Sequence, residues 1–507
     1  MGYELIAAVD LGSNSFRLQV GRVVDDQIYP LDGLKEPVRL AAGLTSQKTL
    51  DGASQLRALE ALRKFNERLR GFAPGAVRAV ATNTLRVAKN APQFLVQAEA
   101  ALGFPIEVVA GREEARLIYV GVAHTLPDPE RQQLVVDIGG GSTEFIIGRS
   151  FEPVELESLY MGCVGFTMRY FPDGRVDKRG LKEAELAART EMQTIVHTFR
   201  EVGWEAAVGS SGTAKALADL LELNGLSDGD ITRDGLEALR SHMLRAGNVN
   251  RLPMEGMRAD RLPVLPGGFA IMSAVFKEFG LERMAFSEGA LRLGVLYDLL
   301  GRYHHHDLRD ATVVQFVRRY QVESGQAQRV AESARALLAQ FGESGHEHDD
   351  TDARMLEWAA HLHEIGISVA HSSYHKHSAY ILANADMPGF SRMDQGRLAR
   401  IVLAHRGKLE RVQAIDPRSA DWVLIFCLRL AVLLHRARDD HPLPEMSVRE
   451  VADGFELDLP ARWQAGNPIT ATALADEVTF WRRIGITLKI GTVPRDKVVQ
   501  LELLQKS

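Results

Sequence analysis

A short glycine-rich segment that occurs twice is the feature that most constrains this fold. Residues 7–21 read AAVDLGSNSFRLQVG, and residues 134–148 read LVVDIGGGSTEFIIG. At a constant offset of 127 residues Asp10 matches Asp137, and glycines and a serine also recur at matched positions. Each copy has the pattern of a strand, a tight polar turn and a second strand. Two such copies predict two similar α/β halves that face one cleft.

The order of predicted elements divides the chain into four parts. Strands alternate with amphipathic helices up to about Tyr303, including one long helix predicted over 181–203. Helical segments then follow one another, and strand-like alternation returns only near the end. A chain of 507 residues also exceeds the usual size of one domain. We therefore expect two α/β domains, an all-helical domain and a small α+β unit, at residues 1–125, 126–303, 304–445 and 446–507.

The turns of the repeat have the chemistry of an anion site. Glycine permits positive φ, and it lets backbone N–H groups approach an anion with no Cβ in the way. An aspartate at the end of a strand can hold a hydrated cation or orient water. Ordinary hairpin turns also favour these residue types, but two matched copies favour the site. The turns are neither a P-loop, since no lysine follows, nor a dinucleotide fingerprint, since a strand follows.

Six segments of the sequence resemble motifs of one enzyme family. They are TNTLRVAKN, GREEARLIYVGVAH, LVVDIGGGSTEF, MGCVGF, GSSGTAKAL and HLHEIGISVAHSSYHKHSAYIL. Together with VDLGSNSFRL they resemble the exopolyphosphatase and guanosine pentaphosphate phosphohydrolase family, in the superfamily of actin, sugar kinases and heat-shock chaperones. The resemblance covers essentially the whole chain. It implies two actin-like (ribonuclease H-like) α/β domains around a cleft, then a degenerate HD-like helical domain, and a homodimer.

The resemblance also implies a metal site beside a phosphate site. It assigns Asp137 and Glu144 to a metal, and a hairpin can fold these two carboxylates toward one point. Two carboxylates with waters suit Mg²⁺, with or without K⁺. Without the family, Glu144 is equally well read as a solvent-facing strand residue. The predicted phosphate-binding residues are Asp10, Gly12, Ser13, Asn14, Ser15, Arg86, Gly139, Gly140, Gly141, Ser142, Thr143, Gly209, Ser211 and Gly212.

Two adjacent acids are the candidates for a water-activating base. Glu113 and Glu114 lie in the first turn of a predicted helix, whose N-terminus favours the ionised form. Glu113 can pair with Arg116 three residues on, whereas Glu114 shares a helix face with Leu117. The family motif places the catalytic glutamate at the second position, so Glu114 is the predicted base. The alternative is that both acids only cap the helix.

Other motifs have both a functional and a structural interpretation. Arg86 matches the family's phosphate-contacting arginine, whose planar fork can hold two oxygens, although the sequence alone favours an exposed arginine at a helix start. The stretch VGSSGTAKAL, residues 208–217, either binds anions or closes a strand–helix turn. For Cys163 we expect a small buried hydrophobe.

The histidine-rich segments predict no metal centre. Three adjacent imidazoles at 304–306 cannot all face one ion from one helix, so a solvated linker is favoured there. In the segment that resembles an HD domain, His363 and Glu364 stand where that motif has His and Asp. This departure favours a helical scaffold that presents lysines and arginines to a long polyanion.

Composition sets the expected compartment. The net charge is −6, which argues against a generally basic nucleic-acid-binding surface. Only two cysteines occur and no signal peptide is visible, so we expect a cytoplasmic protein, with peripheral membrane association left open. The most apolar stretch, residues 422–435, is interrupted by Arg429 and is predicted to be a buried helix, so no transmembrane segment is expected.

These features predict an exopolyphosphatase that removes terminal orthophosphate from inorganic polyphosphate processively. Guanosine pentaphosphate phosphohydrolase is the close alternative, since it would share the site and the metal. An ATP-dependent kinase or ATP-binding protein of the same fold is a remoter alternative, as is a binding protein with an inactive site.

Overall fold

The chain forms two units in the computed structural model. The structure describes residues 3–24, 27–126, 128, 130–256, 258, 261–303, 307–342 and 350–493. The first unit comprises Met1–Leu308 together with Pro388–Arg392, and the second comprises Arg309–Met387 and Met393–Ser507. No feature of the sequence predicts that residues 388–392 group with the first unit. The predicted linker histidines 304–306 lie outside the described residues.

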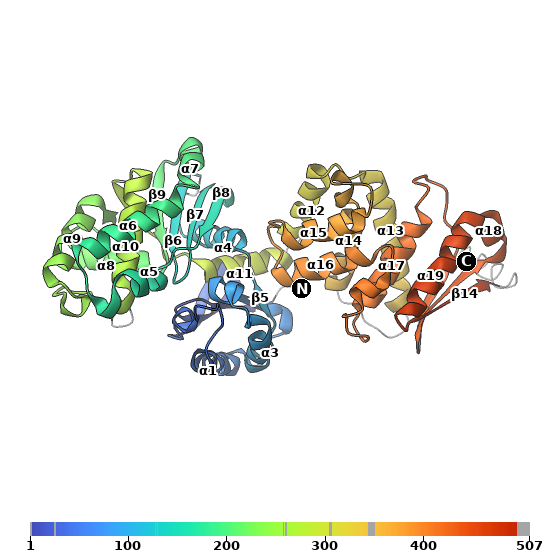
Figure 1. The fold of residues 1–507 in the computed structure, drawn as a ribbon, viewed down its shortest axis with the longest axis horizontal. Coiled ribbons are helices and arrows are strands. Elements are labelled where there is room, and N and C mark those ends of the chain that lie inside the picture. Colours follow the sequence, from blue (N-terminus) through green and yellow to red (C-terminus); the bar gives the residue numbers. More distant parts are fainter. Residues whose placement is uncertain are drawn as a thin grey trace. The chain divides into compact units, whose positions relative to one another are not determined.

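The first unit contains two sheets that repeat one topology (Figure 1). In each sheet an antiparallel three-stranded meander is followed by two parallel strands, and β10 adds an edge to the second. The first sheet has the order β3-β2-β1-β4-β5, with β1 (Leu5–Leu11), β2 (Phe16–Val24), β3 (Gln27–Glu36), β4 (Val77–Ala81) and β5 (Ile106–Val108). The second has the order β10-β11-β9-β6-β7-β8, with β6 (Gln133–Ile138), β7 (Thr143–Arg149), β8 (Glu152–Leu159), β9 (Ala206–Ser210), β10 (Ile231–Thr232) and β11 (Arg283–Phe286). The two α/β halves predicted from the repeat are therefore confirmed.

The register of the two hairpins brings charged residues together. In the first hairpin Asp10 lies opposite Arg17, and in the second Asp137 lies opposite Glu144. Directly opposed residues of an antiparallel pair extend from the same face of the sheet. The second hairpin therefore presents two carboxylates side by side, whereas the first presents a carboxylate and a guanidinium.

Two helices join the halves through close backbone contact. They are α4 (Gly111–Ala123) and α11 (Leu291–Tyr303), which pack against each other (Figure 1). A Cβ on Gly294 would lie 1.7 Å from the carbonyl oxygen of Leu117, and one on Gly121 would lie 2.2 Å from that of Ala290. No larger side chain fits at either position, so the crossing depends on glycine. Around it lies a separate apolar core that draws on both sheets.

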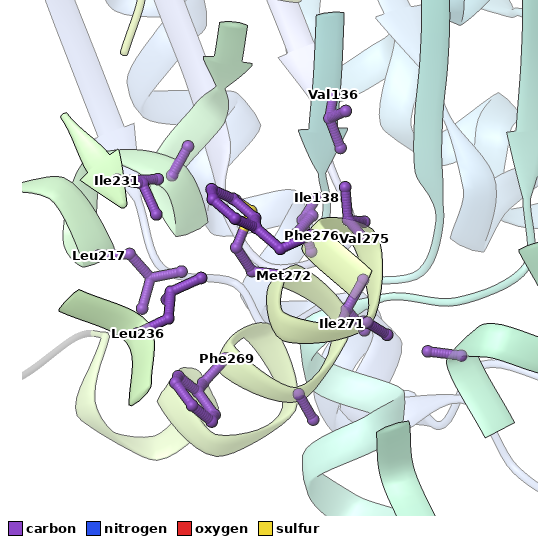
Figure 2. Packing of buried hydrophobic residues seen from close by; sticks show 14 of the residues in the cluster. Val136, Ile138, Leu217, Ile231, Leu236, Phe269, Ile271, Met272, Val275 and Phe276 are labelled. Atoms are coloured by element: carbon purple, nitrogen blue, oxygen red, sulfur yellow. The ribbon is translucent and has the colours of Figure 1, made fainter. Parts of the chain in front are cut away.

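The core of the second half is built around helix α10 (Leu265–Phe279). Figure 2 shows Met272 and Phe276 of this helix in one cluster with Ile138 of β6. Within the described residues, one stretch, Leu262–Phe279, is long and apolar enough to cross a membrane by length and composition. Because 72% of this stretch is buried inside the protein, we assign it to the core.

The prediction of one continuous helix over 181–203 is wrong, because the structure divides this segment into two helices. It consists of α6 (Lys178–Met192) and α7 (Val196–Val202). Between them the hydroxyl of Thr194 donates to the carbonyl of Glu191 at 2.9 Å. Such a local bond competes with the helical pattern and favours a turn. The other helices of this unit are α1 (Gly52–Leu69), α2 (Asn83–Val87), α3 (Ala91–Leu102), α5 (Cys163–Tyr170), α8 (Ser211–Leu223) and α9 (Arg233–Ala246).

The second unit is helical and ends in a small sheet. Its helices are α12 (Leu308–Arg319), α13 (Ser324–Gly342), α14 (Asp350–Leu362), α15 (Tyr374–Asn384), α16 (Arg392–Ala404), α17 (Asp421–Leu434), α18 (Ala461–Gly466) and α19 (Pro468–Arg483). The sheet has the order β12 (Ser447–Val451), β13 (Gly454–Pro460) and β14 (Thr487–Val493). Helix α17 is the predicted apolar helix, and it is almost completely buried. The predicted all-helical and small α+β parts are both confirmed.

Candidate active site

The two hairpin turns meet at a cavity of about 110 Å³ between the halves of the first unit. Helices α4 and α11 contribute Glu114 and Arg292 to its wall. Most of the predicted site residues line it, namely Asp10, Gly12, Ser13, Asn14, Ser15, Glu114, Asp137, Gly139, Gly140, Gly141, Ser142, Glu144, Ser211 and Gly212. Residues from three separate segments, the two hairpin turns and the turn at 211–212, are thus brought to one place.

Three predicted phosphate-binding residues do not line this cavity. The hydroxyl of Thr143 is buried and donates to the carbonyl of Met161 at 2.6 Å. Gly209 lies inside β9, where a Cβ would come within 3.0 Å of Met284 Sδ. Arg86 does not reach the cavity itself, but its guanidinium donates to the carboxylate of Glu114, which does. These three residues therefore contact residues next to the cavity and do not line it.

Both hairpin turns direct their carbonyl groups away from the cavity. The carbonyls of Gly139 and Gly140 accept from the N–H groups of Cys163 and Val164, at the start of α5, at 2.9 and 3.0 Å. In the first turn the carbonyls of residues 13 and 14 likewise accept from the N–H groups of residues 41 and 39. In a planar trans peptide the N–H points opposite to the carbonyl. The following N–H groups of both turns are therefore turned away from these partners and are available to an anion.

The glycines of the turns serve close packing. We expected them to permit positive φ, but neither Gly12 nor the glycines at 139–141 have a φ in that region. A Cβ on Gly140 would instead lie 3.2 Å from the backbone nitrogen of Asn14, in the turn of the first hairpin. A Cβ on Gly162, which packs beneath the second turn, would lie 2.4 Å from the carbonyl atoms of Gly140. The expectation about φ is therefore wrong, and glycine is needed at these positions because a larger side chain would clash with neighbouring atoms.

Among the residues that line the cavity, Ser211 at the start of α8 has a positive φ, of 73°. Its hydroxyl donates to the carbonyl of Ile138 at 3.1 Å, which ties the third turn to the second hairpin. Non-glycine residues with positive φ are uncommon and often occur at functional sites. The third turn is therefore part of the candidate site.

Four carboxyl groups face the cavity, of which three are buried and that of Asp10 is half-buried, and burial raises the pKa of each. The pKa of Asp137 rises to about 6, mainly by burial, although the hydroxyls of Ser211 and Ser210 lower it. Burial and repulsion from Glu114 and Asp137 hold the pKa of Glu144 well above its ordinary value. Burial also raises the pKa of Asp10, whose Oδ1 has no hydrogen-bond partner among the described residues. This cluster is costly unless a cation shares it.

Glu114 and Glu113 are neighbours with different surroundings. Glu114 is 7% exposed, and its Oε2 accepts from Arg86 Nη1 at 3.2 Å. Burial raises the pKa of Glu114 to about 7, against the opposing effect of Arg86. Glu113 instead accepts two hydrogen bonds from Arg116, each at 2.8 Å, and one from the N–H of Gly389 at 2.9 Å. The predicted pairing of Glu113 with Arg116 is confirmed, and Glu114 alone faces the cavity.

Three arginines of the cavity were not predicted from the sequence. They are Arg17, Arg261 and Arg292. Burial and the nearby Arg292 lower the pKa of Arg17 to about 10, so Arg17 stays charged at neutral pH. The repeat contains a signal for Arg17, because it occupies the position that Glu144 has in the second copy. The site thus combines carboxylates with guanidiniums, and this combination suits a cation together with an anion.

A second cavity, of about 280 Å³, continues from the first and shares Arg17, Arg261 and Arg292 with it. Among the described residues that line it, six have cationic side chains and two, Asp219 and Glu288, have acidic ones. Phe286 is the one aromatic residue in the described part of its lining, and Lys215 Nζ lies 5.2 Å from the centre of that ring. The cationic residues are Arg17, Lys35, Lys215, Arg258, Arg261 and Arg292.

The histidines and cysteines provide no second chemical centre among the described residues. No three histidine, cysteine, aspartate or glutamate side chains of that part of the chain form a group that could hold a metal ion. His363 Nε2 lies 3.9 Å from Glu364 Oε1, a contact within the helical unit. Both cysteines are free and buried, as expected for Cys163.

Comparison with known proteins finds one family along most of the sequence. Residues 19–303 match the Ppx/GppA phosphatase family, and residues 308–478 match domain III of that family. An exopolyphosphatase from Cytophaga hutchinsonii shares 24% sequence identity and a TM-score of 0.54, over 59% of this chain and 98% of that one. A second structure, of an exopolyphosphatase-like protein, has 24% identity and a TM-score of 0.53 over 59% and 99% of the two chains. These two structures show the fold of the first unit, and the family match spans more than half of the sequence. The chain belongs to the Ppx/GppA phosphatase family.

Proposed function

We propose that this phosphatase is an exopolyphosphatase that hydrolyses terminal orthophosphate from inorganic polyphosphate, and does so processively. The observation that carries the proposal is the position of Glu114. This carboxylate faces two turns whose N–H groups are available to an anion, and its pKa of about 7 suits a group that accepts a proton at neutral pH.

Each group of the site has a role in this reaction. The terminal phosphate occupies the space between the two turns, where N–H groups of residues 14–15 and 140–141 contact its oxygens. Glu114 accepts the proton of the water that attacks phosphorus, and Arg86 fixes its orientation by the 3.2 Å contact. The departing phosphate is the new end of the shortened chain, and its charge is balanced by Arg17 and Arg292.

The residues present fit a divalent cation. Asp137 and Glu144, which lie opposite each other in the second hairpin, would hold Mg²⁺, and a cation beside them would offset the cost of burying these two carboxyl groups. When bound, Mg²⁺ would neutralise charge on the phosphoryl oxygens. Mg²⁺ usually keeps several waters and takes only one or two carboxylates, so it needs no closed cage of protein ligands.

The second cavity favours polyphosphate over guanosine pentaphosphate. Six cations along a space of about 280 Å³ can contact successive phosphate units of a chain. A guanine base would need a flat apolar or aromatic surface, and the ring of Phe286, the one aromatic side chain that the described residues place there, is partly covered by Lys215. We therefore propose that the cavity holds the phosphates that follow the terminal one.

The decisive experiment compares phosphate release from long-chain polyphosphate and from guanosine pentaphosphate by the purified protein. We expect a larger kcat/KM for polyphosphate, and the opposite order would assign the alternative activity. The Glu114→Gln variant should still bind polyphosphate while kcat falls roughly 10²- to 10⁴-fold. Wild-type turnover by this variant would remove Glu114 from the mechanism.

We also propose that the enzyme is a cytoplasmic homodimer. Two buried, unpaired cysteines suit a reducing compartment. The dimer is proposed from the family resemblance, and the measured mass of the purified protein tests it.

A further inference from the structure

The helical unit contains a large cavity of its own, of about 690 Å³. It lies among the start of α15, the segment that follows α16, and helices α17 and α19. Tyr374 and His375 contribute from α15, residues 405–411 from the segment after α16, and Phe480 from α19. Its volume is in the range of sites that bind nucleotides and other small molecules. We call it the helical-unit pocket.

Positive charge dominates the helical-unit pocket. Of its six cations, Arg429 is bound to Glu477 by two hydrogen bonds of 2.8 and 2.6 Å, and Arg438 is bound to Glu364. The remaining four have no carboxylate within ion-pair distance in the part of the chain that the structure describes. These four are Arg406, Lys408, Arg411 and Arg436. Unpaired cations gathered in a concave space attract an anion.

His375 provides a buried donor beside these cations. Its Nε2 lies 2.6 Å from Arg411 Nη1, and because a guanidinium can only donate, Nε2 accepts. The proton of the neutral ring is therefore on Nδ1, an atom that is buried and has no partner among the described residues. Burial, with Arg411 and Arg406 nearby, lowers the pKa of His375 to about 4, so the ring is neutral at pH 7.

The same contacts argue against a metal ion. Nε2 of His375 is occupied by Arg411, and Nδ1 of His405 contacts the carbonyl of Val402 at 2.5 Å. Among the described residues no group of three metal-ligating side chains forms here. A cation would also be repelled by the unpaired arginines.

We propose that the helical-unit pocket is a binding site for a phosphate-bearing anion, separate from the active site. Arg411 and Arg406 are its main contacts, since a guanidinium matches the geometry of phosphate oxygens. Arg406 lies 4.7 Å above the ring of Tyr374, which limits the number of positions that its side chain can take. The site does not depend on the proposed activity of the first unit, because every residue that forms it belongs to the second.

Two anions distinguish the possible sources of the phosphate. Inorganic tripolyphosphate represents a polyphosphate chain, and GTP represents a nucleotide. Each is titrated into the full-length chain, in a Glu114→Gln background so that the probe is not consumed, while hydrogen exchange is followed by mass spectrometry. We expect protection of peptides that contain residues 374–384 and 405–412. Protection by tripolyphosphate alone identifies an inorganic chain, and protection by GTP identifies a nucleotide.

Charge variants test whether the pocket itself is responsible. Arg411→Ala should weaken the protection of these peptides about tenfold in apparent affinity, and Lys408→Ala should weaken it to a smaller extent. Arg418→Ala removes the same charge from an exposed position of this unit outside the pocket, so it should have no effect. The proposal is overturned if neither anion protects the peptides, or if Arg411→Ala, Lys408→Ala and Arg418→Ala all bind as the parent protein does.

Discussion

Replacing the predicted base should make the first unit more stable at neutral pH. Glu114 is 7% exposed, and burial raises its pKa from 4.5 to about 7. The folded state therefore holds this proton more tightly than the unfolded chain, and ionisation of Glu114 opposes folding as the pH rises. The stabilising effect of the protonated form is complete below pH 4.5 and is lost as the pH rises through about 7.

The size of the effect follows from the shift. One pKa unit corresponds to about 1.36 kcal/mol, so a rise from 4.5 to about 7 gives an upper limit of about 3 kcal/mol at pH 8. Glu114→Gln removes this cost and keeps the shape of the side chain. We expect the variant to gain up to that amount of local stability at pH 8 and to match the parent protein near pH 4.5.

The assay is hydrogen exchange of the amides of α4, read by mass spectrometry in the presence of EDTA and corrected for the intrinsic effect of pH. It reports the local opening free energy, which suits a chain of two units that need not unfold in one step. Glu113→Gln is the matched control. Because Glu113 accepts three hydrogen bonds of 2.8 to 2.9 Å from Arg116 and Gly389, its loss should destabilise the helix, by roughly 2 kcal/mol. The reasoning fails if Glu114→Gln lowers protection at pH 8, or if the two variants change it in the same direction.

Three further predictions test the site from other directions. Gly162→Ala should abolish turnover and destabilise the second hairpin, because the new Cβ would lie 2.4 Å from Gly140. Gly165→Ala is the control and should change neither property, because no atom lies within 4 Å of its new Cβ. Equal thermal stability and activity of the two variants would contradict the packing argument. The value of kcat/KM for polyphosphate should fall as the pH is lowered through a midpoint at or below about pH 7, because Glu114 must be ionised to accept a proton and a bound cation favours the ionised carboxylate. A kcat/KM that does not change between pH 5 and 8 would exclude Glu114 as the base. Arg17→Ala should raise KM for polyphosphate about tenfold and reduce its dependence on salt, and Arg22→Ala, at the exposed end of the same strand, should change neither.

The internal repeat accounts for how much of the fold could be predicted. Matched Asp, Gly and Ser positions indicated two related hairpins, and both sheets do contain the same meander. The edge strands β3 and β8 were not predicted, because they are partly exposed and lack a clear alternation. The break between α6 and α7 was missed since the apolar periodicity continues across it, while the turn depends on a local bond of Thr194.

The site was predicted less completely, and for a different reason. Motifs identify residues that are close in sequence to glycine turns, so the residues of both hairpins were found. Arg261 and Arg292 belong to segments without such a motif, and only the fold brings them to the cavity. Likewise, nothing in the sequence shows that Gly140 packs against Asn14, a residue of the other half.

The crossing of α4 and α11 has a consequence for motion. Backbone contact at Gly121 and Gly294 leaves no space for one helix to slide across the other without a clash. We therefore expect the two halves of the first unit to open by a hinge rotation about this helix crossing. Glu114 is less than one helical turn from Leu117, so it lies close to the axis, whereas the two glycine turns belong to separate hairpins, one in each half. Release of product would then need only the turns to part, with the base held in place for the next phosphate.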